Sequence, residues 1–430
     1  MRPPHSFRTL SRRLGFAAAT IAAIASPALA TWSIILVDTS TGEVAIGQAT
    51  CIANFDLKKG SGVLVVGKGA ACAQSLLDSS GVYRKKIFDG LNAQKTLAQI
   101  LTDLSTDPSL QTKQYGIVEL YGDGDALTFT GVNCGNYKGG VTGQIGTLQY
   151  AIQGNVLTGA PVVSAAEQAI LTTPGDLAAK LMAGMEAARS MGGDGRCSCN
   201  PSQPTSCGSP PPSFTKSAHT GYMVIARVGD LQGTCSSSQG CANGTYYMSH
   251  NVIGATTAPD PVLTMHTLYD TWRTNWMGHA DHVLSVKGFG DVGLPADGAT
   301  TTDLVLTLKD WTGAPLATGG ASITVTHDAT SAGISAIGAV ADLGNGTYKV
   351  PITAGLTTGI DTFRVVANDG MGNVTLYPFP TLPIGAACGS YGSGAPGTGG
   401  QAPTLACAAA PLVGASAFGF RIAQGPAGQS

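Results

Sequence analysis

Charged residues are scarce in this sequence. Only 12% of its 430 residues are Asp, Glu, Lys or Arg, and the formal net charge at pH 7 is -2. A protein that binds nucleic acid needs a basic surface to contact the phosphates, and this composition has no excess of positive charge. We therefore expect no nucleic-acid partner.

Long hydrophobic runs are also missing. A helix that spans a bilayer needs about 20 predominantly apolar residues. The N-terminal apolar stretch, residues 16–24, is shorter than that, and no later stretch reaches the required length. It follows the basic residues Arg2, Arg8, Arg12 and Arg13 and precedes the small-residue site Ala28-Leu29-Ala30. This pattern predicts a signal peptide over residues 1–30, cut after Ala30, and an exported protein without a membrane span.

Glycine, proline and cysteine, by contrast, are plentiful, with 59, 23 and 10 residues. The first two indicate a chain rich in turns and strands. Most cysteines of an exported chain are expected to pair as disulfides. Cys235 and Cys241 are close enough in sequence to close a small loop, and Cys388 and Cys407 bracket a tail segment in which they are expected to pair.

Three further cysteines, Cys197, Cys199 and Cys207, lie in a loop rich in Pro, Ser and Gly. A zinc site there would need further thiolates or imidazoles at the usual spacings. The available candidates, His219 and His250, are badly spaced. We therefore favour disulfides and predict no metal and no cofactor.

The length of the chain indicates two or three domains. In the first, apolar patterns predict strands, then a helix pair, strands, a second helix pair, strands and a last helix, an order that fits an α+β fold with two packed sheets and helices outside. The expected strands are 32–38, 43–50, 62–66, 114–120, 127–132, 150–153, 219–228 and 245–248. The expected helices are a short one after Gly67-Lys68-Gly69 through Leu77, one over 92–104, one opening at Pro161, one opening at 173–176, and one capped by Asp260-Pro261.

The composition changes near Ser285. Short strands rich in Val, Thr and Ile follow, and Asn345-Gly346 is a strong signal for a two-residue hairpin. These features predict an immunoglobulin-like β-sandwich over residues 285–378, with strands over 304–308, 321–326, 347–352 and 361–366. Residues 379–430 are rich in Gly, Ala and Pro and form a predicted tail, which leaves 31–284 as the first domain.

Several stretches of the first domain together resemble Domain of Unknown Function 1028, a family placed among the Ntn-hydrolase-like (N-terminal nucleophile) proteins. They are Thr31-Trp32-Ser33-Ile34, residues 150–157 (Tyr-Ala-Ile-Gln-Gly-Asn-Val-Leu), residues 191–196 (Met-Gly-Gly-Asp-Gly-Arg), Lys216-Ser217-Ala218-His219 and Pro259-Asp260-Pro261-Val262. The resemblance covers residues 31 to roughly 283 and implies a four-layer αββα sandwich. The C-terminal strands resemble invasin-type or cadherin-type repeats of bacterial surface proteins.

Removal of residues 1–30 would leave Thr31 at a free N-terminus. A threonine hydroxyl is a poor nucleophile until a base takes its proton, and an N-terminal threonine can use its own α-amine for this. That amine titrates near pH ~8, so much of it is neutral at neutral pH. The resemblance therefore implies a catalytic Thr31. The alternative is that the residue after the cut only had to be small.

Three other residues are candidates for the same site. Lys68, expected at the end of the third strand, is a candidate for lowering the pKa of the amine through its charge, or else an exposed strand-end lysine. Asn155 is a candidate oxyanion donor, or else a structural turn residue. Asp194, with Arg196, is a candidate for orienting a substrate carboxylate, or else holds its own loop by an ion pair. Ser217 and His219 share a strand face, but no nucleophile-elbow motif surrounds the serine.

The sequence thus predicts an exported Ntn-hydrolase-like protein that hydrolyses an amide bond through Thr31. The expected partner is an amide-containing small molecule or peptide, and a homo-oligomer stays open. The alternative is a catalytically inactive extracellular binding or surface module on the same fold, with the sandwich as a spacer.

Overall fold

The computed structural model describes residues 31–122, 124–385, 391–393, 404–407 and 420–423. The predicted signal peptide, the Cys388–Cys407 disulfide and most of the predicted tail lie outside these ranges. Among the described residues, no helix combines the length and apolar character needed to cross a membrane.

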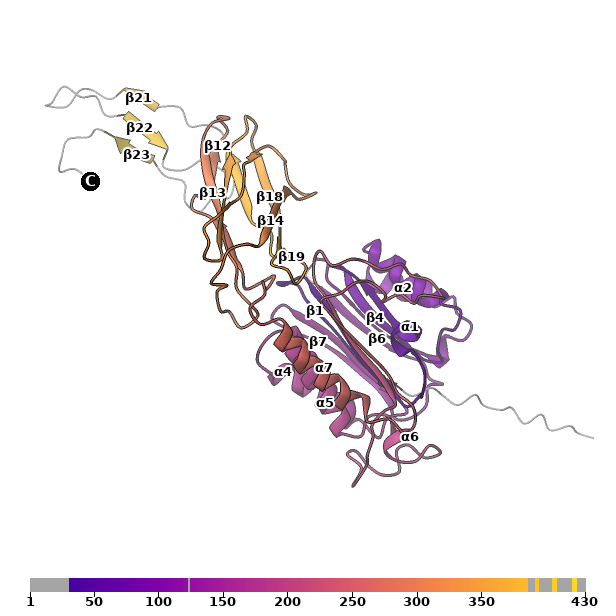
Figure 1. Cartoon of the computed structure of the whole chain (residues 1–430). Helices are drawn as coiled ribbons and strands as arrows, with labels where there is room; N and C mark the ends of the chain where they lie inside the picture. Colours follow the sequence, from indigo (N-terminus) through magenta and orange to yellow (C-terminus); the bar gives the residue numbers. More distant parts are fainter. Residues whose placement is uncertain (1–30, 123, 386–390, 394–403, 408–419, 424–430) are drawn as a thin grey trace, which may run out of the picture.

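Two antiparallel sheets form the centre of the first domain (Figure 1). The six-stranded sheet has the order β10-β9-β2-β1-β8-β7, with bounds Met248–Ile253, Thr220–Ala226, Glu43–Thr50, Thr31–Asp38, Leu148–Asn155 and Lys138–Ile145. The four-stranded sheet has the order β3-β4-β5-β6, with bounds Gly62–Val65, Gly69–Ser75, Lys113–Glu119 and Asp125–Thr130. The mixed α+β class is therefore confirmed.

Helices cover the outer faces of both sheets. The six-stranded sheet packs against α4, α5 and α7, which span Pro161–Thr172, Leu177–Ser190 and Pro261–Asn275. The four-stranded sheet packs against α2 and α3, which span Val82–Asn92 and Leu97–Leu104. Short helical segments lie at Leu57–Ser61 (α1), Leu110–Thr112 (η1) and Gly195–Ser198 (α6).

The alternation of side chains along β1 explains why this strand is apolar on both faces. Ile34 and Leu36 belong to the core that faces the helices, whereas Ile35 and Val37 belong to the core between the two sheets. Successive side chains of a strand point to opposite faces, so a strand covered on both sides needs apolar residues at every position.

Several predicted elements of the first domain agree with the structure. The hairpin of β1 and β2 pairs in register from Thr31 with Thr50 to Asp38 with Glu43. Asp260 caps α7 by accepting a hydrogen bond from the backbone N–H of Val262.

Other element predictions were wrong. The short helix expected after Gly67-Lys68-Gly69 is the strand β4, because pairing with β3 and β5 outweighs the helix propensity of its alanines. Helix α2 and the glycine-rich strand β7 were missed. Thr173 follows α4, and the N-cap of α5 is Asp176. The strand expected over 245–248 begins at Met248 instead.

The second domain is all-β. One sheet has the order β11-β13-β17-β15, with β16 also paired to β17, and spans Val286–Phe289, Thr301–Thr307, Thr347–Thr353, Ala336–Ile337 and Ala341–Asp342. The other has the order β12-β20-β18-β14, with β19 paired to β18, and spans Leu294–Pro295, Thr381–Gly385, Gly359–Asn368, Ser322–His327 and Asn373–Leu376. Strand β20 therefore extends this domain beyond the predicted boundary at residue 378. The short strands β21, β22 and β23 form a separate sheet over Tyr391–Ser393, Thr404–Cys407 and Phe420–Ala423.

The two domains are joined by a hydrogen-bonded segment, residues 276–285. The backbone N–H of Ala280 donates to Asp369 Oδ2 at 2.6 Å, and that of Gly278 donates to Asp310 Oδ2 at 3.0 Å. The backbone N–H of Tyr377 donates to the carbonyl of His282 at 2.8 Å. These contacts fix the connection between the domains.

Asp281 in this segment should make domain stability depend on pH. Burial alone would raise the pKa of Asp281, but His282 and the backbone N–H groups of Leu284 and Val283 outweigh it and lower that pKa to about 2. Because the unfolded value is about 3.9, the stabilisation is present above about pH 4 and is lost as the pH falls through about 2. We expect Asp281→Asn to lower the free energy of unfolding by about 2 kcal/mol at neutral pH.

Denaturant unfolding followed by tryptophan fluorescence at several pH values would measure this difference. The gap between Asp281→Asn and the wild type should close as the pH falls from about 4 to about 2. Asp89→Asn, which removes an exposed ion pair with Lys85, is the control and should change stability little at any pH. An Asp281→Asn effect that does not vary with pH would contradict the expected ionisation.

Candidate functional site

The face between the two sheets changes from apolar to polar toward the start of β1. On this strand Ile35 and Val37 belong to the inter-sheet core, and Ser33 and Thr31 follow on the same face. The same change occurs on β2, β8, β4 and β5. We call the resulting group the inter-sheet polar cluster; its members, all buried, are Thr31, Ser33, Gln48, Thr50, Gln74, Gln114, Gln153 and Asn155.

Glutamine side chains connect the two sheets within this cluster. Gln48 Nε2 donates to Gln74 Oε1 at 2.9 Å, and Gln74 Nε2 donates to Gln114 Oε1 at 2.7 Å. Gln74 Nε2 also donates to the carbonyl oxygen of Thr31 at 3.0 Å, while Gln114 Nε2 donates to that of Gly154 at 2.9 Å. Buried polar groups need such partners, so the chain of amides both holds the sheets together and fixes the backbone at Thr31.

Thr31 lies between two polar side chains of neighbouring strands. Its hydroxyl donates to Thr50 Oγ1 at 3.3 Å. In the strand register it is opposite Thr50 on one side and Asn155 on the other. Asn155 Nδ2 donates to Ser75 Oγ at 3.4 Å. The structure therefore brings the two predicted residues Thr31 and Asn155 together.

Sequence reasoning named only Thr31 and Asn155 of this cluster, and Gln153 is the most informative of the members that it missed. Its side chain is fully buried, yet within the described part of the chain neither Nε2 nor Oε1 has a hydrogen-bond partner. Leaving a buried amide unpaired costs about 1–3 kcal/mol for each group. Gln153 thus offers both a donor and an acceptor to a ligand. Its place two residues before Asn155, on the same strand face, was the available sequence signal.

Asp194 holds the loop at the end of β2. It is fully buried, and its Oδ2 accepts a hydrogen bond from the backbone N–H of Cys51 at 2.7 Å. Arg196 pairs with the same carboxylate through Nη2 at 2.8 Å and through Nε at 3.1 Å. A disulfide between Cys51 and Cys197 fixes the same contact. The geometry favours the structural alternative for Asp194, since these groups occupy its carboxylate.

Lys68 lies at the far end of the four-stranded sheet. Its Nζ donates to the carbonyl of Asn92 at 2.6 Å and to the side chain of the same residue at 2.8 Å. Lys68 directly precedes Gly69, the first residue of β4, whereas the residue of β4 that contacts Thr31 is Gln74, near the other end of the strand. At about 3.3 Å per residue, Gly69 and Gln74 are about 16 Å apart along β4. Lys68 therefore lies too far from Thr31 for its charge to lower the pKa of the Thr31 amine, and that prediction was wrong.

The remaining candidates are engaged in structural contacts. A disulfide joins Cys235 to Cys241, as predicted, and another joins Cys199 to Cys207, a pairing that the sequence left open. The Cys51 and Cys197 sulfurs and a His219 nitrogen lie within 4.8 Å of one another, a spacing compatible with a metal ion, but the disulfide removes the thiolates that would bind it. The hydroxyl of Ser217 donates to Asp260 Oδ2 at 2.8 Å.

Family models match part of each domain. The model of a family of unknown function, DUF1028, matches residues 31–202, and that of invasin domain 3 matches residues 289–376. No curated protein matches the chain.

Solved structures with related parts include a DUF1028-family protein from Silicibacter pomeroyi, with 16% identity, a TM-score of 0.42, and coverage of 56% of this chain and 85% of that one. The Yersinia pseudotuberculosis adhesin InvE shows 21% identity and a TM-score of 0.20, covering 29% of this chain and 34% of that chain. A bacterial integrin-binding invasin shows 16% identity and a TM-score of 0.19, covering 44% of this chain and 31% of that chain. The disulfides and the invasin-like domain indicate an extracellular or surface protein.

Asp194 provides a stability test of the site. Asp194→Asn removes the ion pair with Arg196 and weakens the contact to Cys51, so we expect a loss of about 3 kcal/mol in the free energy of unfolding. Denaturant unfolding under non-reducing conditions measures it. Asp103→Asn, which breaks the exposed pair with Lys95, is the matched control and should cost less than about 1 kcal/mol. Equal effects for the two variants would show that Asp194 does not hold this loop.

Proposed function

Because residues 31–202 match the model of DUF1028, a family of unknown function, we propose that this chain is an exported amide-bond hydrolase with Thr31 as its nucleophile. The observation that carries the proposal is the position of Thr31. It is the first residue of β1 and lies in the inter-sheet polar cluster, between Thr50 and Asn155. Cleavage after Ala30 would create an α-amine on the same residue as the hydroxyl.

The amine and the hydroxyl of Thr31 then act together. The neutral amine takes the hydroxyl proton, directly or through one water, while Thr31 Oγ1 attacks the carbonyl carbon of the substrate amide. The leaving nitrogen receives that proton as the C–N bond breaks, and an ester with Thr31 forms. In the second half of the reaction, the amine takes a proton from a water molecule, which attacks the carbonyl carbon of the ester. The bond to Thr31 Oγ1 breaks, Oγ1 takes back the proton, and the carboxylic acid is released.

Asn155 and Gln153 have roles on the substrate side of this mechanism. Asn155 lies opposite Thr31 in the sheet register and carries an amide N–H that can donate to the oxyanion. Gln153, on the same face of β8, can pair with an amide group through its Nε2 and Oε1. This complementarity supports a substrate that contains an amide, either a small molecule or a peptide.

The layer arrangement supports the same assignment. Helices, the six-stranded sheet, the four-stranded sheet and further helices follow one another, with an apolar core at each contact. We assign this arrangement to the four-layer αββα sandwich of Ntn-hydrolase-like proteins. The polar cluster then lies at one edge of the space between the two sheets.

A catalytically inactive surface module is the second candidate. Two observations favour it, the complete burial of Thr31 and the match of the second domain to invasin domain 3. In that alternative, the inter-sheet polar cluster only joins the sheets, and the chain acts through its outer surfaces. The two candidates differ in whether Thr31 reacts.

The nucleophile can be tested by labelling. We expect N-terminal sequencing of the exported protein to begin at Thr31 and a β-lactone to acylate Thr31, because the freed amine activates its hydroxyl. Mass spectrometry measures the adduct. Thr31→Ser should retain labelling and Thr31→Ala should abolish it. A mature chain that starts at another residue would rule out this nucleophile, and an unlabelled Thr31 in a correctly cut chain would favour the inactive module.

Asn155 gives a second test of the same site. Asn155→Ala should slow acylation by the β-lactone about 100-fold, the effect of removing one oxyanion donor. The rate of adduct formation is the measurement. Gln149→Ala changes a residue on the same face of β8 but at the distant end, opposite Val37, and is the matched control with a nearly unchanged rate. A similar slowing in both variants would point to a general weakening of β8.

A further inference from the structure

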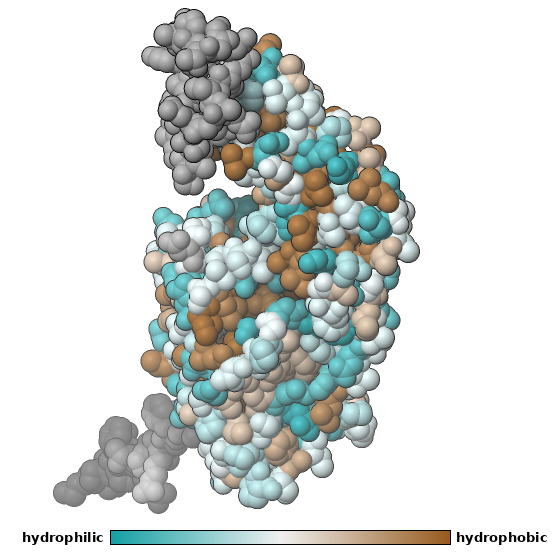
Figure 2. All heavy atoms as spheres, turned by 90° about the vertical axis from the view of Figure 1, so that its left-hand side faces the viewer, coloured by the Kyte–Doolittle hydropathy of each residue, from teal (hydrophilic) through white to brown (hydrophobic). Residues whose placement is uncertain are grey.

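A cavity of about 900 Å³ lies where the two domains meet, far from Thr31. Its walls come from the β1–β2 hairpin, the start of α5, α7, and Trp311 of the second domain. Figure 2 shows a hollow lined by hydrophobic side chains between the two domains. The cavity lies at the Asp38 end of β1 and the inter-sheet polar cluster at the Thr31 end. Eight residues at 3.3 Å each place these two ends about 25 Å apart. The cavity therefore needs an explanation of its own.

One wall carries a buried arginine with an unused donor. Arg273 of α7 is 8% exposed and donates from Nε to the Tyr269 hydroxyl at 2.9 Å and from Nη2 to Asp176. Its guanidinium carbon lies 4.6 Å from the centre of the Trp311 ring. Within the described residues, Nη1 has no hydrogen-bond partner. A buried charged donor without a partner is costly, so Nη1 indicates a ligand that supplies an acceptor oxygen.

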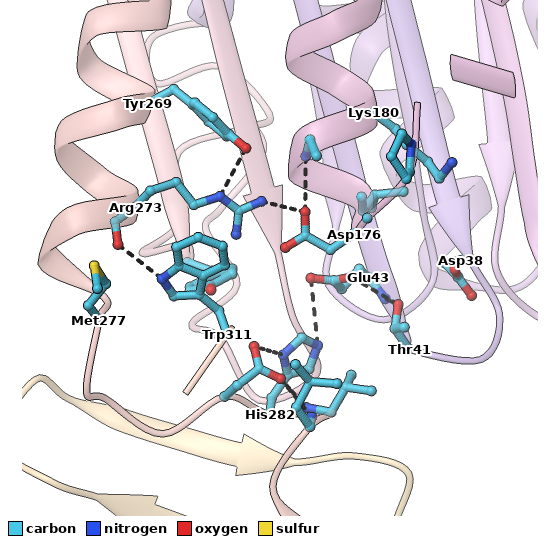
Figure 3. A pocket seen from close by; sticks show the side chains of 18 of the residues that line it. Asp38, Thr41, Glu43, Asp176, Lys180, Tyr269, Arg273, Met277, His282 and Trp311 are labelled. Atoms are coloured by element: carbon cyan, nitrogen blue, oxygen red, sulfur yellow. Dashed lines mark hydrogen bonds and ion pairs between the residues drawn. The ribbon is translucent and has the colours of Figure 1, made fainter. Parts of the chain in front are cut away.

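Further paired charges lie beyond Asp176 in the lining of the cavity (Figure 3). His282 Nε2 lies 3.6 Å from Glu43 Oε1, and His282 Nδ1 lies 3.9 Å from Asp281 Oδ2. Burial raises the pKa of Glu43, and the charge of His282 opposes that shift. The carboxylate of Asp176 is paired to Arg273. Asp38, Lys180 and Asp270 also line the cavity, but they are partly or fully exposed, so solvent and salt screen their charges. The buried charges that remain, those of Glu43, Asp281, His282 and Arg273, favour neither a strongly anionic nor a strongly cationic ligand.

The cavity also offers aromatic rings beside polar acceptors. Tyr247, Tyr269 and Trp311 line it, as do the carboxylates of Asp38 and Asp176. Ligand sites typically combine an apolar or aromatic lining with a few polar groups that fix orientation, in a volume of about 300–1,000 Å³. A ligand that fits must be uncharged, must present apolar faces to the rings, and must carry groups that both donate and accept hydrogen bonds.

We propose that this cavity binds a short uncharged oligosaccharide. The C–H faces of sugar rings pack against aromatic rings, and each hydroxyl both donates and accepts. Arg273 Nη1 donates to a hydroxyl or ring oxygen, and the carboxylate oxygens of Asp38 and Asp176 accept from hydroxyls. The site is distinct from Thr31, so the proposal is independent of amide hydrolysis and holds equally for a surface module.

Saturation-transfer NMR on the full exported chain tests the proposal. The probes are the neutral trisaccharides maltotriose, cellotriose and triacetylchitotriose, each up to about 10 mM, which covers weak affinities. We expect transfer to the protons of at least one probe and saturable binding. Sialyllactose and the trimer of glucosamine are the anionic and cationic arms and should bind at least about tenfold more weakly.

Arg273→Met should weaken binding of the responding probe at least about tenfold, the change expected from losing a charged hydrogen-bond donor. Trp311→Leu changes a partly exposed side chain, so it keeps the test informative if Arg273→Met fails to fold, and it should weaken binding as well. Lys85→Met, on the exposed face of α2, is the control and should bind as the wild type does. The proposal is overturned if no neutral trisaccharide shows transfer, if a charged arm binds as tightly, or if Arg273→Met and Trp311→Leu, once folded, both bind normally.

Discussion

The hydrogen bonds among Gln48, Gln74 and Gln114 are the interaction on which the candidate site depends. The bond from Gln48 to Gln74 crosses the space between the two sheets at the edge where the apolar inter-sheet core ends, and the bond from Gln74 to Gln114 joins neighbouring strands of the four-stranded sheet. Gln114 crosses back to the six-stranded sheet through the carbonyl of Gly154. Apolar side chains would give this edge non-directional packing, whereas amides at fixed distances define one arrangement of the strands. The carbonyl of Thr31 is part of that arrangement, so the backbone of the proposed nucleophile is held by the same bonds that hold the sheets.

The two ends of β1 have different physical character. At its start, the polar cluster is uncharged and built from amides and hydroxyls, and it suits a neutral amide group. At its far end, the hairpin reaches the second domain, and there charged pairs and aromatic rings line the cavity that contains Glu43, Arg273 and His282. A single strand of eight residues thus connects a proposed reactive edge to a proposed binding cavity. The invasin-like domain contributes Trp311 to the lining of that cavity.

Local sequence patterns correctly predicted those elements whose structure is determined by residues close together in the sequence. The both-faces-apolar run of β1, the Asp260 cap of α7 and the Cys235–Cys241 loop depend on neighbours in sequence, and all three are present. The helix expected in place of β4 shows the limit of such patterns. Its Ala-Ala-Cys-Ala segment favours a helix by propensity, but pairing with β3 and β5 makes it a strand. Those partners cannot be read from the segment itself.

By itself the sequence determined the resemblance of the first domain to DUF1028, the mixed α+β class, the invasin-like second domain and the position of Thr31 at the start of a strand. Only the tertiary structure decided which side chains meet Thr31. It brought Asn155 and Gln74 to that residue, and it placed Lys68 at the other end of the sheet. The physical reason is that a strand fixes the face of each side chain through its two-residue period. Its partners, in contrast, depend on pairing and packing between segments more than a hundred residues apart, such as β1 and β8.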